Sequence, residues 1–80
     1  MFEVIKMKDW NIIIRELRED NDYTQKDIAE ILQTSQSYYA QYEKKKRALP
    51  IHHLKTLCKF YHVSADYILG LPEGLPYPRH

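Results

Sequence analysis

The stretch SQSYYAQYEKKKR, from Ser35 to Arg47, gathers the residues of this sequence that are best suited to binding chemistry. It holds two glutamines, three tyrosines and an unbroken run of four cations that ends at Arg47. Glutamine amides both donate and accept hydrogen bonds, while lysine and arginine attract anions. The 80 residues together carry a net charge of only +1, so this local gathering of cations needs an explanation.

The charge is spread unevenly along the chain. Residues 1–35 carry five Lys/Arg against eight Asp/Glu, a net of −3. Residues 36–62 carry six Lys/Arg against one acid, a net of +5, and residues 63–80 have a net of −1. A basic centre in an otherwise slightly acidic domain indicates an anionic partner that binds locally.

Catalytic and metal chemistry find little support. A single cysteine, Cys58, cannot form an internal disulfide and is no zinc pattern on its own. His62 is the only nearby base for that thiol, and one pair at helical spacing is a weak signal. His52 and His53 are adjacent, so on a helix they point about 100° apart, and no carboxylate or cysteine completes a metal site. Glycine-rich phosphate loops and cofactor motifs are also missing, so we expect no enzyme, no cofactor and no metal.

Composition indicates one small cytoplasmic domain. Apolar residues make up 44% of the sequence and charged ones 29%, which is ordinary for a globular protein. The two glycines are too few for an all-β fold with many tight turns. The start, MFEVIKMKDWN, lacks the apolar run of a signal peptide, and no stretch approaches the ~20 apolar residues of a membrane span.

Hydrophobic spacing predicts a first helix from about Asp9 to Asp20, with Asp9 as its N-cap. Thr24 and Asp27 form a variant of the capping box that opens a second, short helix. Tyr23 and Ile28 have the spacing of a hydrophobic staple around that cap.

The residues QTS separate the second helix from a third, which we expect from Ser35 to Lys44 with Ser35 as N-cap. Tyr39 and Tyr42 are spaced i, i+3 and are predicted to face inward. The outward face then carries Gln36, Ser37, Ala40, Gln41 and Lys44. The second and third helices are therefore both short and are joined by a tight turn.

A fourth helix is expected near Pro50, which suits a first helical turn. Its apolar stripe comprises Ile51, Leu54, Leu57, Cys58 and Tyr61. Ser64 caps a short fifth helix and Gly70 ends it. The fold class is therefore all-α, with a lead-in at 1–8, a five-helix domain at 9–70 and a Pro-rich tail at 71–80.

These helices carry a pattern that resembles the lambda-repressor-like helix-turn-helix family, the Cro and XRE group of bacterial and phage regulators, from about Ile12 to Leu71. The matching residues are Leu17, Arg18, Thr24, Gln25, Ile28, Ala29, Leu32, Ser35, Tyr42, Glu43, Lys46, Arg47, Leu49, Pro50, Leu54, Val63, Ser64 and the run YILG. The sequence departs from the family at Gln33 and Lys45, where members have glycine. If those positions are left-handed, a side chain costs about 1 kcal/mol relative to glycine.

The resemblance implies sequence-specific binding of double-stranded DNA, with residues 35–44 as the recognition helix in the major groove. Base contacts are expected from Gln36, Ser37, Tyr38 and Gln41. Phosphate contacts are expected from Gln25, Lys44, Lys46 and Arg47. Family members brace the first residue of the recognition helix with the glutamine that matches Gln25, and pair the residues that match Arg18 and Glu43 in a structural salt bridge.

The implied activity is that of a transcriptional regulator, a repressor that binds a palindromic operator as a homodimer. The candidate dimer residues are Tyr67, Ile68, Leu71, Leu75 and Tyr77. Two alternatives stay open. One is an antitoxin-like or phage-encoded interaction module that binds a partner protein and represses its own operon, and the other is a domain that binds DNA without sequence preference.

Overall fold

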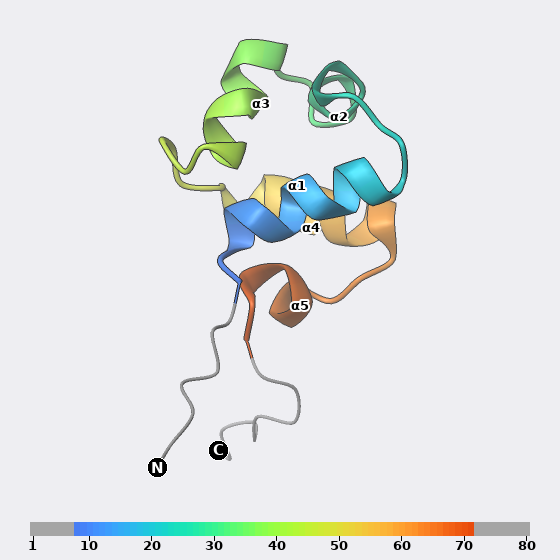
Figure 1. Ribbon diagram of the computed structural model, residues 1–80, viewed down its shortest axis with the longest axis vertical. Coiled ribbons are helices and arrows are strands. Elements are labelled where there is room, and N and C mark those ends of the chain that lie inside the picture. The colour runs from blue at the N-terminus through green and yellow to red at the C-terminus, as the bar shows by residue number, and fades with distance from the viewer. Residues whose placement is uncertain (1–7, 72–80) are drawn as a thin grey trace.

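The computed structural model describes residues 8–71, which form five α-helices and no strand (Figure 1). The helices are α1 (Trp10–Asp20), α2 (Gln25–Ile31), α3 (Gln36–Glu43), α4 (Ile51–Tyr61) and α5 (Ala65–Leu69). The predicted all-α, five-helix fold is confirmed. Only Lys8 of the expected lead-in and Leu71 of the expected tail belong to the described part. None of the described helices is long and apolar enough to cross a bilayer.

Side-chain caps begin four of the helices, at the residues that the sequence indicated. Asp9, Thr24, Ser35 and Ser64 each accept a hydrogen bond from a backbone N–H of the first turn. The capping box of α2 is complete, because the Thr24 N–H also donates to Asp27 Oδ2 at 2.9 Å. Pro50 differs from expectation: it is the N-cap of α4 and lies outside the first helical turn.

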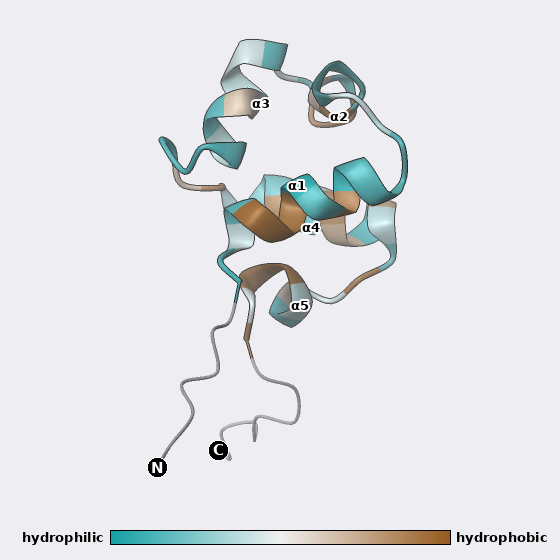
Figure 2. Cartoon of the chain, in the orientation of Figure 1, coloured by the Kyte–Doolittle hydropathy of each residue, from teal (hydrophilic) through white to brown (hydrophobic). Residues whose placement is uncertain are grey.

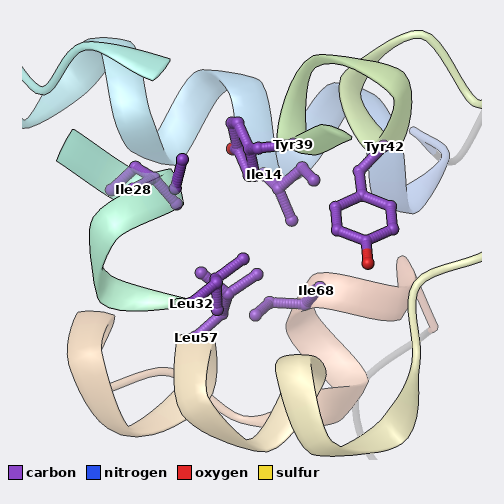
Figure 3. Packing of buried hydrophobic residues seen from close by; sticks show 8 residues of the cluster. Ile14, Ile28, Leu32, Tyr39, Tyr42, Leu57 and Ile68 are labelled. Atoms are coloured by element: carbon purple, nitrogen blue, oxygen red, sulfur yellow. The ribbon is translucent and has the colours of Figure 1, made fainter. Parts of the chain in front are cut away.

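The core draws at least one buried side chain from every helix (Figure 3). Its fully or nearly buried members are Ile14, Ile28, Ala29, Leu32, Tyr39, Tyr42, Leu57 and Ile68. Two expectations fail here. Ile51 is 75% exposed and does not belong to the buried stripe of α4, because it is the first residue of that helix. Ile68 is 0% exposed and cannot lie on a dimer face.

The helices fall into three tiers (Figure 1). α2 and α3 contact each other at one end of the molecule, α5 lies at the opposite end, and α1 and α4 lie between them. α1 contacts both α3 and α5, so it connects the two ends. This arrangement leaves one side of α3 free of other helices.

All five helices close in the same left-handed manner. Asp22, Gln33, Lys45, His62 and Gly70 have positive φ angles between 57° and 72°. After α2, Gln33 N donates to Glu30 O and Thr34 N donates to Ala29 O. The corresponding pair of bonds follows α3, and both are Schellman closures. The two positions where the family has glycine are thus left-handed, although each carries a side chain.

Candidate nucleic-acid interface

α3 has two chemically distinct faces. Tyr39 and Tyr42 point into the core and are 0% and 1% exposed, as their spacing predicted. Gln36, Ser37 and Tyr38 are exposed on the other face, and Gln41 is half-buried there. The apolar face therefore fixes the helix to the protein while the polar face remains open to a partner.

A buried ionic cluster fixes the C-terminal end of α3. Arg18 of α1 binds Glu43 in a bidentate pair, with Nε–Oε2 at 2.7 Å and Nη2–Oε1 at 3.1 Å. Gln25 of α2 donates to the same carboxylate at 3.0 Å, and Asn11 of α1 donates to the Glu43 backbone carbonyl at 3.0 Å. Arg18 also donates to the Tyr23 carbonyl. Three helices therefore meet at one carboxylate.

The surroundings of Glu43 keep that carboxylate ionised. Burial alone would raise its pKa, but hydrogen bonds from Arg18 and Gln25 outweigh burial, and the net pKa is lowered. The neighbouring Tyr39 hydroxyl also lowers the pKa of Glu43, although it has no hydrogen-bond partner within the described residues. Burial, with Glu43 beside it, raises the pKa of Tyr39, so this phenol stays protonated.

Gln25 occupies a different place from the one that the resemblance implied. Its amide braces Glu43, at the last turn of α3, instead of the first residue of that helix. The reason is electrostatic: a buried carboxylate is a stronger acceptor than any group at the exposed start of α3. One N–H of the amide is committed to this bond and the second remains.

The loop after α3 carries the basic run, and its first part is hydrophilic (Figure 2). Lys44, Lys46 and Arg47 are exposed, and none of the three pairs with a carboxylate within residues 8–71. Lys45 differs, because its ammonium pairs with Asp9 at the start of α1. That ammonium and the Trp10 N–H lower the pKa of Asp9.

Three of the predicted DNA-contacting residues form a cluster of their own. Arg47 Nε donates to Gln41 Oε1 at 2.7 Å, and its guanidinium carbon lies 4.5 Å from the centre of the Tyr38 ring. Tyr38 in turn meets Tyr42 edge to face, with the ring centroids 5.6 Å apart. The Tyr42 hydroxyl lies 3.1 Å from His53 Nδ1 of α4.

Gln36 and Ser37 stand apart from this cluster, at the first turn of α3. Ser37 Oγ lies 3.4 Å from the capping oxygen of Ser35. Gln36 forms no side-chain hydrogen bond within the described residues. The predicted base-contacting residues thus share one face but divide into a first-turn pair and a last-turn cluster.

Sequence reasoning missed two residues that hold α3 in place. Asn11 lies on the same side of α1 as Arg18, seven residues and about two turns earlier, and this spacing was a usable signal. His53 was considered only as a metal ligand, whereas here it bonds Tyr42. Among residues 8–71, no three His, Cys, Asp or Glu side chains are placed to hold a metal ion.

Comparison with known families accounts for this geometry. A family model described as Helix-turn-helix matches residues 14–68. The chain belongs to the helix-turn-helix family. The resemblance to the Cro-type group is thereby confirmed, and the matched residues belong to a family of DNA-binding regulators and not to a family of enzymes.

Sequence similarity links this helix-turn-helix protein to a bacterial relative. It is 37% identical over 60 residues to the Bacillus subtilis (strain 168) protein named "Uncharacterized HTH-type transcriptional regulator YobD". The match covers 75% of the chain, which spans about half (54%) of the length of that relative.

Two crystal structures share its fold. A transcriptional regulator from Listeria innocua matches with a TM-score of 0.77 at 20% identity, over 92% of this chain and 68% of that one. The clp gene regulator ClgR from C. glutamicum matches with a TM-score of 0.67 at 22% identity, over 75% of this chain and 78% of that one.

Proposed function

We propose that this protein binds double-stranded DNA in a sequence-specific manner and represses transcription, with α3 in the major groove. The observation that carries the proposal is the exposed polar face of α3 next to a loop with three cations that have no carboxylate partner in the described residues. DNA offers both of the complementary surfaces, base edges and phosphates.

The assignment of roles follows the two faces of the motif. Gln36, Ser37, Tyr38 and Gln41 contact base edges. Lys44, Lys46 and Arg47 lie along a phosphate strand, and the second N–H of the Gln25 amide reaches a phosphate near α2. Burial of Glu43 and its bonds to α1 and α2 support this assignment, since a reading helix has to be held rigidly to discriminate between bases.

We further propose a homodimer on a palindromic operator, with its recognition helices about 34 Å apart. Tyr67, Leu69 and Leu71 support a contact through α5, because each is exposed by 42–53% although apolar or aromatic. Leu75 and Tyr77 lie outside the described residues. As a regulator of bacterial or phage DNA, the protein acts in the cytoplasm.

The same exposed side chains also suit the alternative of an antitoxin-like module with a protein partner. Truncation after Gly70 distinguishes a homodimer surface from a surface that binds a different protein. A dimer built on α5 and the tail predicts slower-sedimenting protein and weaker operator binding after truncation, whereas a partner-binding surface predicts unchanged values for both.

Selection of bound sites from random duplex DNA tests the proposal most directly. We expect an enriched, two-fold symmetric sequence that binds at least ~10³-fold more tightly than random duplex. The double variant Gln41→Glu with Lys46→Glu places negative charge at the interface and abolishes binding. Lys59→Glu, an exposed charge reversal on α4, is the matched control and retains it. Equal retention of both variants on DNA would refute the placement of α3.

A further inference from the structure

The bond between Gln41 and Arg47 fixes which way the glutamine amide faces. Arginine has only donors, so the atom that meets Arg47 Nε at 2.7 Å has to be the amide oxygen. The Nε2 group of Gln41 is therefore turned away from Arg47, and the orientation of the amide is determined chemically.

This orientation changes what Gln41 can read. A glutamine that recognises adenine accepts from adenine N6 through its oxygen and donates to N7 through its nitrogen. Here the oxygen is already occupied by a cation. Although it has a second lone pair, the positive guanidinium beside it opposes the approach of a further N–H donor. The adenine fork is thus disfavoured while the bond to Arg47 lasts.

The groups that the Gln41–Arg47 pair still offers to a partner are N–H donors. Gln41 offers its Nε2–H₂ group, and Arg47 keeps the four N–H groups of its two Nη atoms, for which no partner exists within residues 8–71. In the major groove, guanine is the base that presents two acceptors, N7 and O6, and no donor.

The core holds this cluster in position. Arg47 lies over the Tyr38 ring, Tyr38 contacts Tyr42, and Tyr42 is 1% exposed and bonded to His53. A guanidinium that is stacked and hydrogen-bonded before binding loses less conformational entropy on contact with a base than a free one. Lys46, its exposed neighbour, has no such support among the described residues.

We propose that the N–H donors of Gln41 and Arg47, held in place by Tyr38, select guanine, and that Arg47 determines specificity instead of only gripping a phosphate. The inference rests on the DNA-binding function proposed above. Arg47 then contacts a base edge instead of the DNA phosphate backbone, and Gln41 contributes to a preference for guanine instead of the preference for adenine that a free glutamine would have.

Site selection with five proteins, the wild type and four variants, tests the proposal. Gln41→Ala identifies the operator position that the cluster reads, because preference is lost there alone. At that position the wild type selects guanine by roughly 5- to 150-fold, the range of one good bidentate contact. Arg47→Ala releases the Gln41 oxygen, so the preference moves from guanine to adenine. Arg47→Lys retains the charge but lacks the planar fork that lets one side chain hold the amide and face a base edge together, so it loses the guanine preference while keeping its salt dependence.

Lys46→Ala is the matched control, since it removes the adjacent cation without touching the cluster. It should weaken binding to all sequences equally and leave the guanine preference intact. The proposal is overturned if the wild type selects adenine at the Gln41-dependent position. It is also overturned if Arg47→Ala weakens binding uniformly without changing the selected base. Absence of any enriched site with the wild type would overturn the proposed function itself, which keeps the two failures distinct.

Discussion

At the scale of single residues, Glu43 has the greatest structural influence. Its carboxylate takes hydrogen bonds from α1 and α2, and its side chain is only 3% exposed. A buried charge of this kind depends on its partners, because without them nothing offsets the free-energy cost of removing the charge from water. The position of α3, the helix proposed to face DNA, thus depends on a residue on its buried side.

Arg18→Ala removes the principal partner of that carboxylate. We expect the free energy of unfolding to fall by about 3–5 kcal/mol, the usual cost of breaking a buried pair. Denaturant unfolding measures it. Arg15→Ala is the control: its pair with Glu19 spans 3.9 Å between side chains that are more than half exposed, so its loss should cost less than about 1 kcal/mol. Equal stability of the two variants would rule out a structural role for Arg18.

Glu43 also predicts a dependence of stability on pH. Its pKa is lowered by folding from an ordinary value of 4.5, so its contribution is fully present above that pH and is lost as the pH falls through the lower, folded value. Unfolding measured from pH 7 to pH 3 should therefore show wild type and Glu43→Gln converging below pH 4.5. A constant difference across this range would mean that the carboxylate charge contributes nothing.

The residue scale also shows where sequence reasoning stopped. The Arg18–Glu43 pair was anticipated because both residues match family positions. The Gln41–Arg47 bond was not, because it joins a helix to a loop whose path turns on Lys45, a non-glycine residue at φ 58°. A left-handed Lys45 could be suspected from the family pattern, but the direction in which it sends Arg47 could not.

At the scale of elements, helix starts were readable and helix ends were less so. Asp9, Thr24, Ser35 and Ser64 are strong capping residues, and each lies where the structure places a cap. The left-handed closures use glycine only at Gly70. There φ is 72° and a Cβ would lie 2.2 Å from the Lys8 carbonyl oxygen, so both the backbone and the space demand glycine.

Gln33→Gly should stabilise the turn between α2 and α3. Glycine adopts φ 58° without the Cβ cost, so the free energy of unfolding should rise by about 1 kcal/mol. Thermal unfolding followed by circular dichroism measures the change. Lys44→Gly is the control, because Lys44 has φ −87° and glycine there should instead destabilise by roughly 0.5–1 kcal/mol. Destabilisation by both would show that Gln33 makes an unrecognised contact.

At the scale of the whole molecule, the charge asymmetry of the sequence becomes a surface. The net charge of +5 in residues 36–62 includes the exposed Lys44, Lys46 and Arg47, which follow α3 directly. The acidic N-terminal part contributes Asp9, which pairs with Lys45. Lys45 is therefore the one cation of the run 44–47 that has a carboxylate partner within the described residues. Net charge alone, at +1, would have concealed this arrangement.

Salt dependence of DNA affinity tests that surface. Each phosphate neutralised by a cation contributes about 0.9 to the slope of log affinity against log salt concentration. Lys46→Ala should reduce the magnitude of the slope by about 0.9, with affinity measured in a series of salt concentrations. Lys59→Ala removes an exposed cation from α4 and should leave the slope as it is. Identical slopes for the two variants would place Lys46 away from the backbone.

The division of α3 into two faces has a consequence for how such a protein can evolve. Tyr39 and Tyr42 are among the largest fully buried side chains, whereas Gln36 and Ser37 across the helix are exposed. If α3 reads DNA as proposed, exchanges at positions 36 and 37 can redirect the molecule to another target with little loss of stability, whereas exchanges at 39 and 42 would disrupt the core. Related proteins could therefore differ in their DNA target sequences while their fold stayed the same.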